Sequence, residues 1–189
     1  MSLLPIKFRI QRAAQILSEG GLVAYPTEAV WGLGCDLWDE LAVERLLTLK
    51  QRSPAKGLIL VAGAISQFDW LLADLSAAQQ SRLRLSWPGP TSWLVPHRQL
   101  VPQWISGEHE TVALRVSDHP VIVELCHAFG GPIVSTSANI SGHRPAMEPY
   151  QVRQIFGAEL DYLVPGRLGG RPRPSMIKDL VSDNVVRGA

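Results

Sequence analysis

Residues 50–62 read Lys50-Gln51-Arg52-Ser53-Pro54-Ala55-Lys56-Gly57-Leu58-Ile59-Leu60-Val61-Ala62, a cationic loop followed by an apolar run. The run is short, branched and uncharged, which predicts a buried strand. Upstream, Asp39 can cap a helix with apolar residues at helical spacing, so Lys50 and Arg52 fall where that helix ends. Cations on such a rigid edge suit an anionic ligand. A competing interpretation is a solvated turn whose cations complement the helix dipole, and the spacing alone leaves both open.

Length and charge limit the kind of protein this is. The chain has 189 residues and a hydrophobic content of 46%, which is enough for a substantial core, and we predict a single domain over residues 1–189. Lys and Arg number 18 against 17 Asp and Glu, a net charge of +1. No overall basic field therefore favours non-specific nucleic-acid binding, and any anion site must be local.

Targeting, redox and metal signals point to an ordinary intracellular protein. Residues 1–7 lack the apolar region of a signal peptide, and no stretch approaches the ~20 apolar residues of a membrane span, so we expect a cytoplasmic protein without a membrane partner. Cys35 and Cys126 are far apart and outside any CxxC pattern, which favours buried reduced thiols. The histidines have no metal-binding spacing, so we expect no structural zinc site.

Hydrophobic periodicity predicts about five helices and seven strands. The main helices are expected over residues 6–17, 39–49, 76–85, 119–129 and 148–156, and the strands over 22–25, 58–62, 91–95, 111–116, 132–134, 176–180 and 185–187. Residues 96–110 have no clear period and predict a surface loop, and residues 165–175 predict a long basic loop. Helix and strand alternate early whereas hairpins occur late, so we predict an α/β fold with a twisted, open, mixed parallel and antiparallel sheet.

Polar residues follow two of these strands, at the place where ligands bind in open α/β sheets. Residues 27–36 combine a hydroxyl, a carboxylate, an aromatic ring and glycines, although Trp31 itself is better explained as a core residue. Residues 135–142 supply hydroxyls, an amide and turn-forming backbone. In the strand 111–116, Arg115 needs an anionic partner, unless this is an edge strand and the charge faces water.

Five segments together resemble the YrdC-like family of threonylcarbamoyl-AMP synthases: residues 25–29, 50–52, 111–115, 135–142 and 174–177. The KxR and SxN elements of that family are present in order, as Lys50/Arg52 and Ser137/Asn139. The resemblance covers nearly the whole chain and fits the short bacterial form. The chain departs from the family at Lys56-Gly57, where Asn-Pro is frequent, and at Val61, where His is frequent.

The resemblance implies a YrdC-like sheet around a deep basic cavity. It also implies a nucleotidyltransferase that joins L-threonine, bicarbonate and ATP into threonylcarbamoyl-AMP, with release of pyrophosphate, for the t6A37 modification of tRNA. Mg²⁺ would arrive with ATP, the protein would hold no metal of its own, and other proteins of the t6A pathway would be partners. The sequence has no GxxxxGKS/T loop, so triphosphate binding would rest on separate cations and Mg²⁺.

Site residues follow from the resemblance by position. Those implied are Lys50 and Arg52 as catalytic residues, Lys50, Arg52, Lys56, Thr111, Asn139 and Arg187 as ATP contacts, and Thr27, Arg115, Ser137 and Ser175 as threonine contacts. Arg115 would take the threonine carboxylate as a bidentate fork. No side chain stands out as a general base. The acids Glu28, Asp36, Asp118 and Asp179 are candidates for Mg²⁺ or for no role, and we interpret Asp36 and Asp118 as structural.

Two other functions remain open at this stage. The cavity and the basic residues Arg167, Arg171, Arg173 and Lys178 could grip double-stranded RNA or tRNA, although no signature of a known RNA-binding module is present. A non-catalytic adenylate sensor would bind ATP without turnover. We also hypothesise that residues 167–175 close over ATP, because Gly169-Gly170 offers a pivot among arginines.

Overall fold

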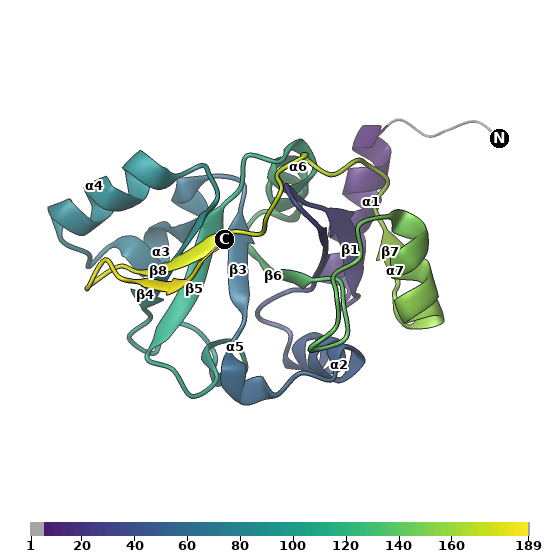
Figure 1. Ribbon diagram of the computed structural model, residues 1–189, viewed down its shortest axis with the longest axis horizontal. Helices are drawn as coiled ribbons and strands as arrows, with labels where there is room; N and C mark the ends of the chain where they lie inside the picture. Colours follow the sequence, from purple (N-terminus) through teal and green to yellow (C-terminus); the bar gives the residue numbers. More distant parts are fainter. Residues whose placement is uncertain (1–5, 189) are drawn as a thin grey trace.

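The computed structural model describes residues 6–188, so residues 1–5, most of the segment considered for a targeting signal, and residue 189 lie outside the description. Within the described residues, nine strands form one sheet in the order β7-β1-β2-β6-β3-β5-β4-β8-β9 (Figure 1). The strands are β1 (Val23–Pro26), β2 (Trp31–Gly34), β3 (Ile59–Ala62), β4 (Thr91–Pro96), β5 (Thr111–Val116), β6 (Ile133–Ser137), β7 (Tyr162–Leu163), β8 (Met176–Asp179) and β9 (Val185–Arg187).

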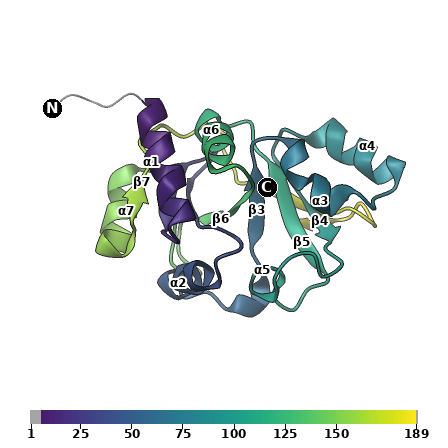
Figure 2. The same cartoon turned by 180° about the vertical axis from the view of Figure 1, so that it is seen from behind.

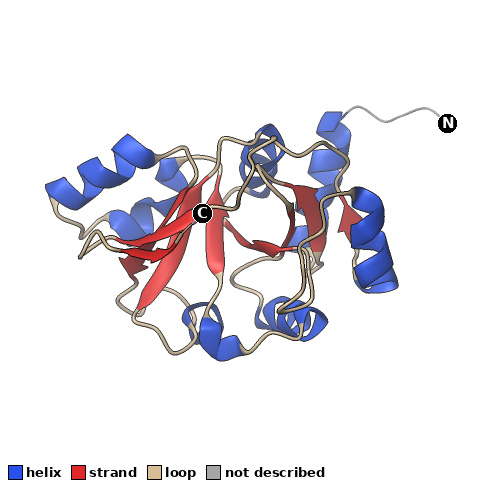
Figure 3. Ribbon diagram, viewed as in Figure 1, coloured by secondary structure: helices blue, strands red, loops and turns tan. Residues whose placement is uncertain are grey.

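The sheet mixes both strand directions, as the alternation of elements predicted. The pairs β1/β7, β3/β5 and β4/β8 are parallel, and the remaining neighbours are antiparallel. Helices surround the sheet (Figure 3). They are α1 (Ile6–Ser18), α2 (Glu40–Lys50), α3 (Asp69–Leu72), α4 (Ala77–Ser86), α5 (Gln103–Ser106), α6 (Pro120–Phe129) and α7 (Pro149–Phe156), with short 3₁₀ turns η1 (Pro54–Lys56), η2 (Ile65–Phe68) and η3 (Gly157–Glu159). The mixed α/β fold is therefore confirmed, while the single domain over residues 1–189 stays a prediction.

Two apolar clusters lie on opposite faces of the sheet. Val23 and Tyr25 of β1 pack into the cluster that contains α1 and α6, whereas Ala24 between them packs into the cluster that contains α2. This is the alternation that a strand buried on both faces requires. Helices α1 and α6 lie beside each other in both Figure 1 and Figure 2, and they pack together over β1 and β3.

The end of α2 fixes the path of the cationic loop. Asp39 caps the helix by accepting a hydrogen bond from the Ala42 backbone, as predicted. Gln51 ends it in the left-handed conformation, with φ of 51°, and donates its backbone N–H to the last turn. The 3₁₀ turn η1 follows, and Leu58 then hydrogen-bonds to the Ile105 carbonyl before β3 begins. The loop is therefore tied to regular structure at both ends.

The sequence predicted no strand within residues 27–36, but Trp31–Gly34 forms strand β2, antiparallel to β1 and β6. Trp31 is buried in the core, as its size suggested. Two of its four residues are glycines, so hydrophobic periodicity does not predict this strand. A side chain at Gly34 would meet the Val134 carbonyl oxygen at 2.5 Å and the Tyr25 ring at 2.9 Å, so the close approach requires glycine.

Two more short elements escaped prediction. Residues 96–110 were expected to be a surface loop, but they contain α5, in which Ile105 is fully buried. The two-residue strand β7 pairs with β1 and was also missed. Both are too short to show a period of their own. Among residues 6–188, no helix has the length and apolar character needed to cross a membrane.

Candidate active site

A cavity of about 410 Å³ lies against the middle of the sheet, on the face that α6 covers only in part. In-register residues of neighbouring strands share a face, so Val61 of β3 and Arg115 of β5 both point into it, as do Ile59 and Ser135. The volume falls in the range of about 300–1,000 Å³ that is typical of small-molecule sites. The described lining residues are Thr27, Glu28, Ala29, Val30, Trp31, Gly32, Arg52, Leu58, Ile59, Val61, Pro90, Ser92, Arg115, Ser135, Thr136, Ser137, Pro145, Arg171, Arg173, Pro174, Ser175, Arg187 and Gly188.

The charge of this lining is strongly one-sided. Its described members include one carboxylate side chain, that of Glu28, against the guanidinium groups of Arg52, Arg115, Arg171, Arg173 and Arg187. These arginines come from the end of α2, from β5, from β9 and from residues 165–175, which we call the strap. The nearly neutral chain thus concentrates positive charge in one place, and the cavity suits an anionic ligand.

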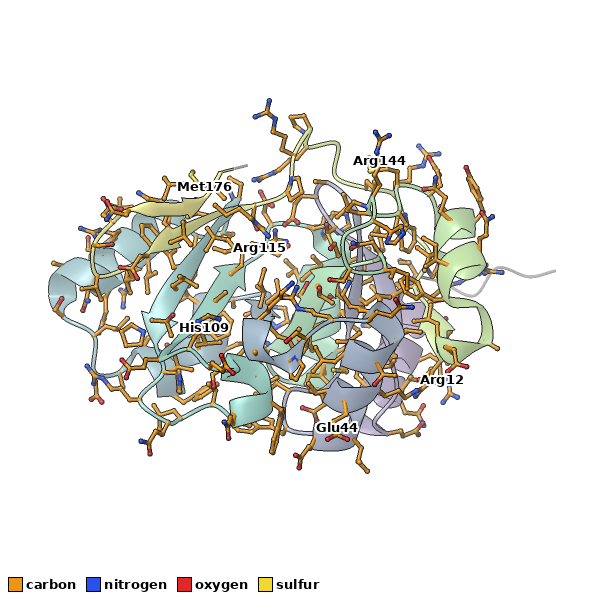
Figure 4. The ribbon with its side chains drawn as sticks, turned by 60° about the horizontal axis from the view of Figure 1, so that its bottom comes forward. Arg12, Glu44, His109, Arg115, Arg144 and Met176 are labelled. Carbon is orange, nitrogen blue, oxygen red and sulfur yellow. The ribbon has the colours of Figure 1, made fainter. Side chains whose placement is uncertain are left out.

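Arg115 is a lining cation that is paired with a buried carboxylate. Its Nη2 donates to Oε2 of Glu28 at 2.6 Å, and the exposed fractions of the two side chains are only 12% and 7%. Burial alone would raise the pKa of Glu28, but the charge of Arg115 and a hydrogen bond from Ser117 outweigh it and hold that pKa below 4.5. Strand β5 lies between β3 and β4, so the idea of an edge-strand arginine facing water is wrong. Figure 4 shows Arg115 in the middle of the molecule.

Arg52 is the unpaired counterpart. Its Nη2 donates to the Gly57 carbonyl at 2.8 Å, while Nε is buried and has no hydrogen-bond partner in the part of the chain that the structure describes. Burial, and then the nearby charge of Arg187, lower the pKa of the Arg52 guanidinium. No ion pair of this side chain with an acid is recorded among residues 6–188. A half-buried cation without an anion is costly, so this position is prepared for a charge from outside.

Lys50 connects the two motifs of the family resemblance. It is buried, and its Nζ donates to the carbonyl oxygens of Ser137 and Asn139, the latter at 2.9 Å. The Ser137 hydroxyl in turn donates to Oδ1 of Asn139 at 2.6 Å. Burial, followed by the charge of Arg52, lowers the pKa of Lys50 to about 8. Lys50 therefore lies behind the cavity wall and holds the turn after β6 in place.

The predicted site residues divide into two groups. Those that line the cavity are Thr27, Arg52, Arg115, Ser137, Ser175 and Arg187. Outside its lining lie Lys50, Lys56, Thr111 and Asn139. Lys50 and Asn139 are bound to the backbone beneath it, Lys56 is exposed on η1, and Thr111 lies at the far end of β5 from Arg115. Their ATP-binding roles stay predictions.

Several lining residues were not singled out from the sequence as site residues. Ser92 is fully buried and its hydroxyl lies 3.0 Å from that of Ser175, which it orients at the cavity wall. Ser135 and Thr136 of β6 also belong to the cavity lining. The sequence offered one indication for Ser92, namely a hydroxyl next to the apolar residues of β4. Only the parallel pairing of β4 with β8 brings this hydroxyl to Ser175.

The strap runs over the cavity and is bound to its rim. Gly169 donates its backbone N–H to the Thr27 carbonyl at 3.0 Å, and Arg171 donates its own to the Glu28 carbonyl at 2.8 Å. The Arg171 side chain also pairs with Asp118 at 2.5 Å. A side chain at Gly169 would lie 3.0 Å from the Glu28 Cα, so the glycine permits this close contact. Asp118 thus has a structural role in the strap, as interpreted from the sequence.

The thiols and acids of the described region show no assembled metal centre. Cys35 and Cys126 are buried and free, as predicted, and burial raises the pKa of both thiols, that of Cys126 to about 12. No group of three or more His, Cys, Asp or Glu residues within 6–188 lies close enough to hold a metal ion.

A family model described as "Telomere recombination", Sua5_yciO_yrdC, matches residues 15–188. The chain belongs to this family. The resemblance inferred from the motifs is thereby confirmed. Among curated Sua5/YciO/YrdC relatives, a protein of Pseudomonas aeruginosa (strain UCBPP-PA14) named threonylcarbamoyl-AMP synthase is 54% identical over 182 residues, which is 96% of this chain and 98% of that protein. A protein of the same name from Stutzerimonas stutzeri (strain A1501) is also 54% identical, with the same coverage.

Solved structures of the Sua5/YciO/YrdC family share the fold. Sua5 of P. abyssi, solved in complex with L-threonine, is 31% identical with a TM-score of 0.85, over 92% of this chain and 51% of that one. The chain thus spans about half of that longer protein. E. coli YciO is 25% identical with a TM-score of 0.84, over 96% of this chain and 89% of that one.

Proposed function

We propose that the chain is a nucleotidyltransferase that forms threonylcarbamoyl-AMP and pyrophosphate from L-threonine, bicarbonate and ATP, in the cytoplasm, for the t6A37 modification of tRNA. The observation that carries the proposal is the 54% identity, over 96% of the chain, to proteins named threonylcarbamoyl-AMP synthase. The arginine-lined cavity supports it, because this reaction brings a carboxylate and a triphosphate together. Other proteins of the t6A pathway would receive the product.

The chemistry explains the need for so many cations. Bicarbonate takes up a proton and loses water to give CO₂, and the neutral threonine amine adds to CO₂ and releases a proton, which leaves a carbamate. A carbamate oxygen then attacks the α-phosphorus of ATP in line, displacing pyrophosphate. An anionic nucleophile and an anionic nucleotide repel each other, so the protein accelerates this step chiefly by neutralising charge and aligning the reactants. None of these steps requires a strong base from the protein, which agrees with the sequence, where no side chain stands out as one.

We assign the two kinds of arginine to the two anions. Arg115, which is paired with Glu28, would bind the threonine carboxylate, with Thr27, Ser137 and Ser175 completing that end of the cavity. Arg52, which has no acidic partner among the described residues, would face the phosphates together with Arg187. Each charge-assisted hydrogen bond would contribute about 1.5–3 kcal/mol.

Mg²⁺ would accompany ATP and would not occupy a site of its own in the protein. The carboxylate of the described lining, Glu28, is already committed to Arg115 and Ser117. Mg²⁺ keeps much of its water shell and binds readily through substrate phosphates, so it does not need a dedicated cage. The metal would therefore enter the cavity together with the nucleotide.

The test is pyrophosphate release from ATP with L-threonine and bicarbonate each present or omitted. The proposal expects release only with both co-substrates, and a collapse of release in Arg52→Ala. Arg12→Ala is the matched control, because Arg12 is an exposed residue of α1 far from Arg115 in Figure 4. ATP binding without release under any combination would instead favour a non-catalytic adenylate sensor.

A primary role in binding double-stranded RNA or tRNA has less support. Arg171 is paired with Asp118, and Lys178 is paired with Asp183 and lies over the Trp93 ring, so these cations are partly neutralised within the protein. RNA binding through phosphates would weaken steeply with salt. If the double variant Arg171→Ala/Arg173→Ala lost tRNA binding but kept pyrophosphate release, the two roles would belong to different residues.

We further propose that the strap closes more tightly when both substrates are bound. It lies over arginines that the substrates would neutralise, and backbone hydrogen bonds from Gly169 and Arg171 already fasten it to the cavity rim. Amide hydrogen exchange in residues 165–175 should slow when ATP and L-threonine are added together. Exchange that is equally fast with and without them contradicts the closure.

A further inference from the structure

Glu28 is a buried carboxylate in the cavity wall that takes no part in the reaction described above. It follows β1, in the turn that leads to β2, and is 5% exposed. Its Oε2 accepts the hydrogen bond from Arg115 at 2.6 Å, and its Oε1 accepts one from the Ser117 hydroxyl at 2.5 Å. Both oxygens therefore accept hydrogen bonds, one from Arg115 of β5 and one from Ser117, the residue that follows this strand.

The groups around this carboxylate are held rigidly. Ser117 is fully buried, donates its backbone N–H to the Ala62 carbonyl at 3.0 Å, and accepts a hydrogen bond from the His119 backbone at 3.0 Å. It is thus fixed between the end of β3 and the start of α6. The Glu28 carbonyl is bound by the Arg171 backbone of the strap at 2.8 Å. The carboxylate has little freedom to turn.

The contact with Glu28 uses only part of the Arg115 guanidinium. Arginine presents five N–H donors in a planar fork, and the pair with Glu28 is made through Nη2. Within residues 6–188, no other hydrogen bond of the Arg115 side chain is recorded, and this residue lines the cavity. One edge of the Arg115 guanidinium is therefore bound to Glu28, while its remaining N–H donors are available to a ligand.

We propose that Glu28 is a positioning residue, which holds the Arg115 guanidinium in the orientation that receives the carboxylate of the amino-acid substrate, and that Ser117 fixes Glu28 for this purpose. The identity of the amino acid, L-threonine, rests on the function proposed above. A preoriented planar fork binds a carboxylate through two parallel hydrogen bonds, whereas a freely rotating one must first lose side-chain entropy.

The test compares Glu28→Gln with the wild type. Glutamine keeps the size and one acceptor oxygen but removes the charge that holds Arg115. The Kd of L-threonine by calorimetry, and its KM in pyrophosphate release, should rise about tenfold or more, because a charge-assisted contact becomes a neutral one. The KM of ATP should stay within about twofold, because Arg52 is untouched. Glu124→Gln, on the exposed side of α6, is the control for loss of one negative charge.

Three results would overturn the proposal. Unchanged L-threonine affinity would show that Arg115 needs no support. Tighter affinity would show that Glu28 competes with the substrate carboxylate for Arg115. Equal losses for L-threonine and ATP, with a lower Tm, would show a merely structural role. If Glu28→Gln does not fold, Ser117→Ala is the variant to measure, because it keeps the Glu28 carboxylate. The Kd of this variant for L-threonine should rise severalfold, while its KM for ATP stays unchanged. An unchanged Kd for both substrates overturns the proposal.

The design separates this inference from the proposed function. A wild type that binds L-threonine without releasing pyrophosphate would contradict the synthase activity, and the Kd values of the variants would still decide the role of Glu28. If the wild type releases pyrophosphate only with L-threonine, and Glu28→Gln binds L-threonine with an unchanged Kd, the proposed activity is supported and the positioning role of Glu28 is contradicted. A wild type that binds no L-threonine would overturn both.

Discussion

Arg115 and Arg52 line the same cavity but are held in different ways. Arg115 has a buried carboxylate 2.6 Å away, whereas Arg52 has a backbone carbonyl and a buried Nε without a partner. A cation neutralised by its own protein is stable and fixed in direction. A cation that is not neutralised costs free energy until a ligand supplies the charge. The difference indicates that one arginine is built for orientation and the other for charge.

The largest effect is expected when the paired cation is removed. Arg115→Ala leaves the Glu28 carboxylate buried without its partner, so the free energy of unfolding should fall by about 3–5 kcal/mol. Urea denaturation at pH 7 measures this. The double variant Arg115→Ala/Glu28→Ala should recover part of the loss, because no buried charge is then left unpaired. A single variant as stable as the wild type would contradict the distinction between the two arginines.

Removing the unpaired cation should affect activity and not stability. Arg52→Ala deletes a half-buried charge for which the described residues offer no acidic partner, but it also loses the hydrogen bond to Gly57. Because these two effects oppose each other, the free energy of unfolding should change by less than about 1 kcal/mol. Pyrophosphate release should fall about 100-fold, because the phosphates lose a charge-assisted contact during the reaction. A loss of stability comparable to that of Arg115→Ala, at unchanged turnover, would reverse the comparison.

The pH dependence of stability can isolate the Glu28 contribution. The pKa of Glu28 is depressed in the folded protein, so its contribution is fully present above its ordinary value of 4.5 and is lost as the pH falls through the folded pKa. Glu28→Gln should therefore cost about 1–2 kcal/mol at pH 7, and less as the pH falls below 4.5. Denaturant titrations of both proteins across this range measure the difference. A cost that does not change with pH contradicts the ion pair.

The smallest effect is expected for Lys50, a buried cation behind the cavity wall. Its pKa is lowered from 10.5 to about 8, so the unfolded chain binds more protons between these values and stability should rise with pH in that window. Relative to Lys50→Met, the wild type should gain about 1 kcal/mol between pH 7 and pH 9. A gain of the same size in Lys50→Met would assign the effect to other groups.

Local patterns were sufficient for most of the fold. Asp39 predicted the start of α2, and the spacing of apolar residues predicted α1, α6 and the central strands. Strand β2 escaped because its glycines are explained only by their neighbours, the Tyr25 ring and the Val134 carbonyl. Helix α5 and strand β7 escaped because four and two residues are too few to show a period.

For the candidate site too, some residues could be predicted from the sequence and others could not. The resemblance, carried over position by position, named Arg52, Arg115 and Ser175 as site residues, and all three line the cavity. The sequence alone thus determined the mixed α/β fold, its central strands and the family. Only the tertiary structure decided that Lys50 lies behind the wall, that Ser92 joins Ser175, and that Glu28 supports Arg115. These contacts join residues 83 to 89 positions apart, through strand pairing and burial that no local pattern encodes.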